Sequence, residues 1–166
     1  DLRGVIPPLV YQKGAWFLHM LRAQVGTDTF WKGIREYYAR YRNSNASTDD
    51  LRQVMEEASG QKLGWFFNQW LNWNYSPVLA GTWSYDPSAK MVTIDLAQTQ
   101  SDSTYRLPLD IGLVGDSAGV APRIAKIEMT QSKQHFEIPA EKAPRDVILD
   151  PDTWMLMRPP SFSRRQ

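Results

Sequence analysis

The chain of 166 residues contains no cysteine, which excludes disulfides and thiolate metal sites. It has only two histidines, His19 and His135, and neither has a second ligand at helical or hairpin spacing. No apolar stretch approaches the roughly 18 residues that a membrane-spanning helix needs. Nineteen basic and eighteen acidic residues leave a net charge of +1, which indicates no basic surface for nucleic acid. The sequence therefore predicts no metal site in this chain, no membrane span and no nucleic-acid partner.

The apolar content is ample for a folded core, at 42% hydrophobic and 12% aromatic residues. At this length the chain can form one domain or two small ones. The lack of cysteine is compatible with an oxidising compartment without demonstrating one. The compartment therefore stays unknown, with a periplasmic or extracellular location slightly favoured over a cytoplasmic one.

The first half of the chain has the apolar periodicity of four helices. The first is expected over about 9–25, where only a narrow strip is polar, and Gly26 ends it. The second follows Thr27, and the third is capped by Ser47 or Thr48 and closed by Gly60. The fourth carries an apolar stripe at i, i+3, i+4, i+7 and i+8, formed by Leu63, Phe66, Phe67, Trp70 and Leu71.

Near residues 74–77 the apolar period changes from 3.6 to 2, and proline at such a change indicates a domain boundary. Short alternating strands follow, and their turn-punctuated spacing favours a small β-sandwich. They are expected around 92–96 and 107–113 and at 78–85, 124–130, 135–138, 146–149 and 154–157. The predicted fold is α+β in two segments: four helices over 1–76, an antiparallel β-sandwich over 77–157, and a disordered tail over 158–166.

The run Tyr11-Gln12-Lys13-Gly14-Ala15 opens the first expected helix. It resembles the segment that carries the catalytic tyrosine of gluzincin zinc aminopeptidases, the family that includes aminopeptidase N. The segments 66–79 and 147–152 resemble the family's helix-to-sandwich junction and the end of its sandwich. The family also follows its tyrosine with helices and then a small β-sandwich, which is the order expected here. Gln12 departs from many relatives, which have glutamate at this position.

The resemblance implies that residues 1–76 are the helical C-terminal part of a metallopeptidase catalytic domain. In the family, an H-E-x-x-H helix and a further glutamate bind the zinc upstream of the tyrosine, and this chain contains none of them. We therefore expect a fragment of a larger zinc-dependent aminopeptidase that removes N-terminal residues from peptides. Zinc is expected in the full-length parent, and no zinc and no peptidase activity in the fragment. Its expected partners are the peptide substrate and the missing N-terminal catalytic portion.

Tyr11 is the candidate catalytic residue. Peptide hydrolysis places negative charge on the carbonyl oxygen, and a phenol can donate a hydrogen bond to that oxygen. The alternative is that Tyr11 only packs on the apolar side of its helix. Gly14 and Ala15 are candidate supporting residues, since small side chains allow a substrate or another backbone to approach closely. Lys13 either orients the segment or projects into solvent.

Two other functions are compatible with the same motif. One is a non-catalytic scaffold or interaction protein of the same fold, and the other is a hydrolase of a non-peptide substrate such as a lipid epoxide. Because the first helix is apolar on nearly every side, we also expect exposed apolar surface on the isolated fragment. The fragment is expected to self-associate through residues such as Trp16, Phe17 and Met20.

Overall fold

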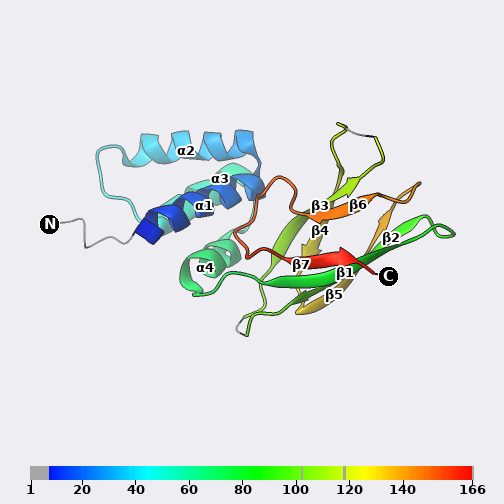
Figure 1. The fold of residues 1–166 in the computed structure, drawn as a ribbon. Helices are drawn as coiled ribbons and strands as arrows, with labels where there is room; N and C mark the ends of the chain where they lie inside the picture. The colour runs from blue at the N-terminus through cyan, green and yellow to red at the C-terminus, as the bar shows by residue number, and fades with distance from the viewer. Residues whose placement is uncertain (1–7, 102, 118, 166) are drawn as a thin grey trace. The chain divides into compact units, whose positions relative to one another are not determined.

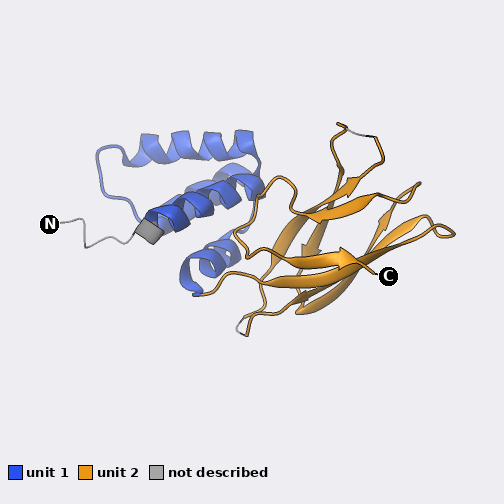
Figure 2. Ribbon diagram, viewed as in Figure 1, with its two compact units in different colours: residues 1–74 blue, residues 75–166 orange. Residues whose placement is uncertain are grey.

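The computed structural model describes residues 8–101, 103–117 and 119–165, and residues 8–10 by their backbone only. The fold of these described residues is α+β: four helices precede seven strands, which form a four-stranded and a three-stranded sheet (Figure 1). The chain divides into two compact units, residues 1–74 and residues 75–166 (Figure 2). The expected boundary lay between residues 76 and 77, close to this division.

Several of the helix boundaries lie at residues that favour a helix terminus. They are α1 (Pro8–Val25), α2 (Thr27–Tyr41), α3 (Thr48–Ser59) and α4 (Gly64–Asn72). Gly26 separates α1 from α2 with a φ of 87°, which glycine adopts without steric cost. Ser47, rather than Thr48, caps α3: its side chain accepts from the Asp50 amide while the Asp50 carboxylate accepts from the Ser47 amide. Gly60 then ends α3 in the left-handed region.

Aromatic side chains of α1 and α4 form the centre of the helical unit. The ring of Phe17 lies 5.4 Å from that of Phe66 and 4.9 Å from that of Phe67, between centroids. On α3, Val54 and Met55 are buried. Gly33 of α2 lets α3 come close, because a Cβ there would lie 2.6 Å from the sulfur of Met55.

One expectation about this unit is wrong. Phe17 and Met20 were expected to lie exposed, but only 4% and 2% of their surfaces are accessible. Both lie on the face of α1 that also buries Leu21 and Val25, and Phe17 packs on the two phenylalanines of α4. The remaining helices therefore cover more of α1 than its nearly uniform apolar composition suggested.

Two strands of the second unit, residues 91–98 and 146–149, alternate buried and accessible side chains along their whole length, as predicted. The four-stranded sheet has the order β5-β2-β1-β7 and contains β1 (Leu79–Asp86), β2 (Met91–Gln98), β5 (Lys133–Pro139) and β7 (Ser161–Arg164). The three-stranded sheet has the order β4-β3-β6 and contains β3 (Leu107–Val114), β4 (Arg123–Met129) and β6 (Asp146–Leu149). Every pairing is antiparallel except β1 with β7. The buried side chains of both sheets form the core of a small β-sandwich.

The end of the chain differs from the prediction. Residues 158–166 were expected to be disordered, yet β7 pairs in parallel with β1, from Ala80 opposite Ser161 to Trp83 opposite Arg164. The edge of β1 supplies backbone partners for an added strand. Arg165 holds the strand end, because its guanidinium donates to Asp95 at 2.6 Å and to Thr82 Oγ1 at 3.2 Å.

The strand expected at 154–157 is absent from the described chain. Instead, the two carboxylate oxygens of Asp150 accept from the backbone amides of Trp154 and Met155, each at 2.8 Å. These amides therefore need no strand partner. Burial raises the pKa of the Asp150 carboxyl above its usual range, although the hydrogen bonds from the two backbone amides act in the opposite direction.

Candidate functional site

The sequence-predicted site residues lie together on the first two turns of the described part of α1. Tyr11, Gly14, Ala15 and Leu18 follow the helical spacing i, i+3, i+4 and i+7, so they share one face. Tyr11 exposes 69% of its surface and Leu18 37%, and Gly14 and Ala15 are also exposed. The structure therefore presents the Tyr11 side chain to its surroundings and does not pack it into the helical core.

Lys13 connects α1 to the end of α4. Its ammonium group donates to the backbone carbonyl of Trp73 at 3.3 Å, and Trp73 is the residue that follows the last turn of α4. A cation is favourable near the carbonyl groups that a helix leaves unpaired at its C-terminus. The contact is compatible with a role of Lys13 in orienting the segment, and that role stays a prediction.

Gly14 has open space around it. A Cβ built at this position meets no atom within 4 Å apart from its own helix and chain neighbours. The described part of the chain therefore gives no steric reason for glycine here. Glycine at position 14 leaves room for a group outside the described residues to approach this face of α1 closely.

Gly14→Ala is expected to raise the free energy of unfolding of the 166-residue chain by about 1 kcal/mol, because alanine is the better helix former. Urea denaturation of both proteins measures the difference. Gly33→Ala is the matched control and should lower stability, since its Cβ would lie 2.6 Å from Met55 Sδ. A loss of stability in the Gly14 variant would show that this face of α1 is covered in solution.

Neither histidine forms part of a metal cluster in the described residues. His19 packs its ring edge-to-face with Trp16, with centroids 5.5 Å apart. His135 Nδ1 lies 2.7 Å from an Asp95 oxygen, and this hydrogen bond raises the pKa of His135. Residues 8–101, 103–117 and 119–165 contain no group of three or more histidine, aspartate or glutamate side chains arranged to bind a metal ion. The zinc implied by the resemblance thus has no fitting ligand set here, and we derive no step through it.

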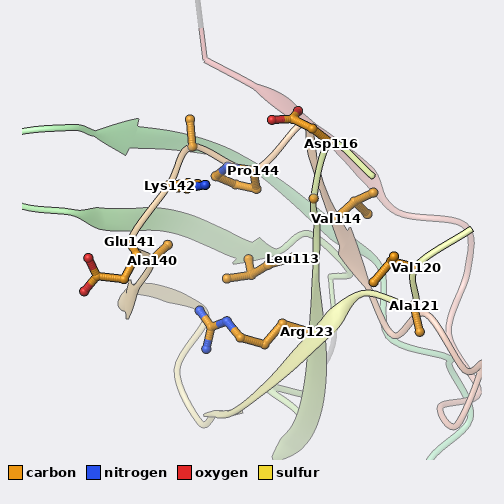
Figure 3. A pocket seen from close by; sticks show the side chains of 12 residues that line it. Leu113, Val114, Asp116, Val120, Ala121, Arg123, Ala140, Glu141, Lys142 and Pro144 are labelled. Atoms are coloured by element: carbon orange, nitrogen blue, oxygen red, sulfur yellow. The ribbon is translucent and has the colours of Figure 1, made fainter. Parts of the chain in front are cut away.

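A pocket that the sequence did not indicate lies at one end of the β-sandwich (Figure 3). It has a volume of about 350 Å³ and is lined by residues 113–116, 120, 121, 123 and 140–144. The lining residues come from the end of β3, the connection from β3 to β4 and the first residue of β4, and from the connection between β5 and β6. No motif links two such distant loops, so only the fold brings them together.

Comparisons with known proteins point to one family. Residues 3–70 match the model of the peptidase family M1 domain. The chain is 31% identical over 105 residues to aminopeptidase N of Escherichia coli (strain K12), covering 61% of this chain and 12% of that protein. It is 35% identical over 72 residues to aminopeptidase N of Lactococcus lactis subsp. lactis, covering 43% of this chain and 8% of that protein.

The likeness to a solved structure extends over the whole fold. The crystal structure of Legionella pneumophila aminopeptidase A in complex with aspartic acid superposes with a TM-score of 0.77. The match covers 96% of this chain and 19% of that one at 18% identity, so it concerns the fold alone. The chain thus spans less than a fifth of the length of each of these relatives.

No helix in the described residues has the length and apolar character that crossing a bilayer requires.

The expected order of helices followed by a β-sandwich is present, and the family match covers the helices that contain the Tyr11 segment. The resemblance predicted from the sequence is therefore confirmed: the chain is similar to the peptidase family M1 domain over residues 3–70 and to bacterial aminopeptidases N over part of its length.

Proposed function

We propose that this chain is a segment of a larger zinc-dependent aminopeptidase that releases N-terminal residues from peptides. Within that enzyme, the phenol of Tyr11 donates a hydrogen bond to the oxygen of the scissile carbonyl as negative charge develops on it. Such a donor accelerates hydrolysis only as far as it binds the transition state more strongly than the substrate.

The exposure of Tyr11 is the observation that carries this proposal. An apolar helix usually buries its tyrosines, but α1 turns Phe17, Met20 and Leu21 to the core and leaves Tyr11 outside. A phenol in this position is free to contact a substrate. The alternative that Tyr11 is a packing residue has no support in the described contacts.

The surroundings of Tyr11 favour the same role. Gly14 and Ala15, on the same face, add almost no side-chain volume, so a peptide backbone can approach the helix closely. Lys13 holds α1 to the end of α4 through the Trp73 carbonyl, which restricts the position of this turn. A fixed donor is more effective than a mobile one, because it needs no reorganisation during the reaction.

An assay of the full-length protein tests this function. We expect it to release leucine from a leucyl peptide with a free amino terminus and to leave the N-acetylated peptide intact. Amino acid analysis of the products measures both reactions. Absence of release from a panel of free peptides would contradict the proposal; turnover of an epoxide instead would assign the protein to a non-peptide substrate, and inactivity on both would favour a scaffold.

A further inference from the structure

The pocket at the end of the β-sandwich combines an apolar floor with charged groups at its margin. Leu113 and Pro144 are buried, and Val114, Ala121 and Ala140 supply further apolar lining. With about 350 Å³, the pocket lies at the lower end of the range usual for small-molecule sites. It can therefore hold a small organic molecule but not a folded element of another protein.

Two cations, Arg123 and Lys142, line this pocket together with two acidic residues, Asp116 and Glu141. The Arg123 guanidinium donates through one terminal nitrogen to the Pro139 carbonyl, which fixes its position and leaves its other N–H groups available. Lys142 forms no ion pair with any residue that the structure describes. Figure 3 shows both side chains on the same side of the pocket.

The two acidic residues of the lining do not cancel this charge. Glu141 already pairs with Lys90, at 2.6 Å, and in Figure 3 its carboxylate points away from the pocket. Asp116 is exposed, and its carboxylate lies at the opposite end of the pocket from the Arg123 guanidinium. The side of the pocket near Arg123 and Lys142 thus favours an anion.

We propose that this pocket binds a small carboxylate with a short, branched apolar body. The carboxylate is held by Arg123 and Lys142, and the apolar body lies on Leu113, Val114 and Pro144. A guanidinium group can bind a carboxylate through two parallel hydrogen bonds, whereas the ammonium group acts as a point charge. The proposal does not depend on the aminopeptidase function, since none of these residues lies in the helical unit.

Two sources could supply such a ligand: a free monocarboxylic acid or the terminal carboxylate of a peptide. Both share the anion and the apolar body that the pocket recognises. A small apolar acid at a partly open site is expected to bind with a dissociation constant on the order of 1 mM. Its affinity should fall as salt is added, because salt screens exposed charges.

The test is a titration of the 166-residue chain followed by amide NMR signals. 3-Methylbutanoate and N-acetyl-leucine are the two probes, and 3-methylbutanol and N-acetyl-leucinamide are their uncharged counterparts. We expect both acids to shift the signals of residues 113–116, 120–123 and 140–144, and the uncharged compounds to leave them unchanged. The tighter of the two acids identifies the source.

Three variants complete the experiment. Arg123→Gln and Lys142→Gln should each weaken binding of the acids about tenfold, the usual effect of losing one charge-assisted contact. Lys62→Gln, an exposed position in the helical unit, removes the same charge and should change nothing. The proposal is wrong if the acids cause no shifts at 100-fold molar excess, if the alcohol binds equally well, or if Lys62→Gln weakens binding as much as the pocket variants.

Discussion

Tyr11→Phe in the full-length enzyme is expected to lower kcat by about 10²- to 10³-fold, the usual cost of removing one oxyanion donor. KM for an aminoacyl substrate should change little, because the phenol hydrogen bond forms mainly in the transition state. Phenylalanine keeps the ring, so the packing of α1 is retained. Steady-state kinetics on a leucyl substrate measure both constants.

Tyr38→Phe is the matched control for this experiment. Tyr38 lies on α2 and exposes 68% of its surface, nearly the same fraction as Tyr11. It has no place in the proposed site, so its loss of a hydroxyl should leave kcat unchanged. Equal rates for the Tyr11 variant and the wild-type enzyme would return Tyr11 to the role of a surface residue.

Gly81→Ala is expected to destabilise the β-sandwich by at least about 2 kcal/mol, the upper part of the usual range for an overpacked site. Gly81 lies in β1 opposite Leu96 of β2, where an added Cβ would lie 2.2 Å from the backbone oxygen of Asp95 and 2.8 Å from Leu96 Cδ2. A backbone oxygen in a paired strand cannot rotate away as a side chain can. The two strands must therefore shift apart.

Urea denaturation followed by circular dichroism in the strand region measures this loss. Gly115→Ala is the control, since Gly115 follows the last residue of β3 in the same unit and an added Cβ there meets nothing within 4 Å. We expect this variant to unfold at nearly the wild-type urea concentration. If Gly81→Ala unfolded there as well, the close approach of β1 to Asp95 would not exist in solution.

The periodicity of the sequence predicted the helices and most strands because their signals are local. Gly26, Ser47 and Gly60 lie where a helix begins or ends, and each acts through its own backbone or side chain. The alternation of Val92, Ile94 and Leu96 likewise follows directly from a strand with one buried face. These features need no knowledge of the remaining chain.

The failures concern contacts between distant residues. The tail forms β7 because β1 offers an edge and because Asp95, seventy residues away, accepts from Arg165. Residues 154–157 form no strand, and the side chain of Asp150 accepts from the amides of the first two of them, Trp154 and Met155. The burial of Phe17 depends on α4, about fifty residues later. Apolar composition alone did not show which face of α1 would be covered.

In the candidate site, too, the sequence predicted what depends on local signals and missed what depends on contacts between distant residues. The motif located Tyr11, Lys13, Gly14 and Ala15, and helical geometry placed three of them on one exposed face. The contact of Lys13 with the Trp73 carbonyl could not be predicted, because it depends on where α4 ends. The sequence did not predict the pocket in the β-sandwich, because the segments around the β3–β4 and β5–β6 connections share no sequence motif.

The most direct test of the central claim compares ligand affinities of the full-length enzyme and its Tyr11→Phe variant. A phosphinic peptide carries the tetrahedral geometry and charge of the transition state, while the corresponding uncleaved peptide represents the ground state. If Tyr11 stabilises the transition state, the variant should bind the phosphinic peptide about 10²- to 10³-fold more weakly. Its affinity for the uncleaved peptide should stay within about threefold of the wild-type value. Equal losses for both ligands, or no loss for either, would contradict the role of Tyr11.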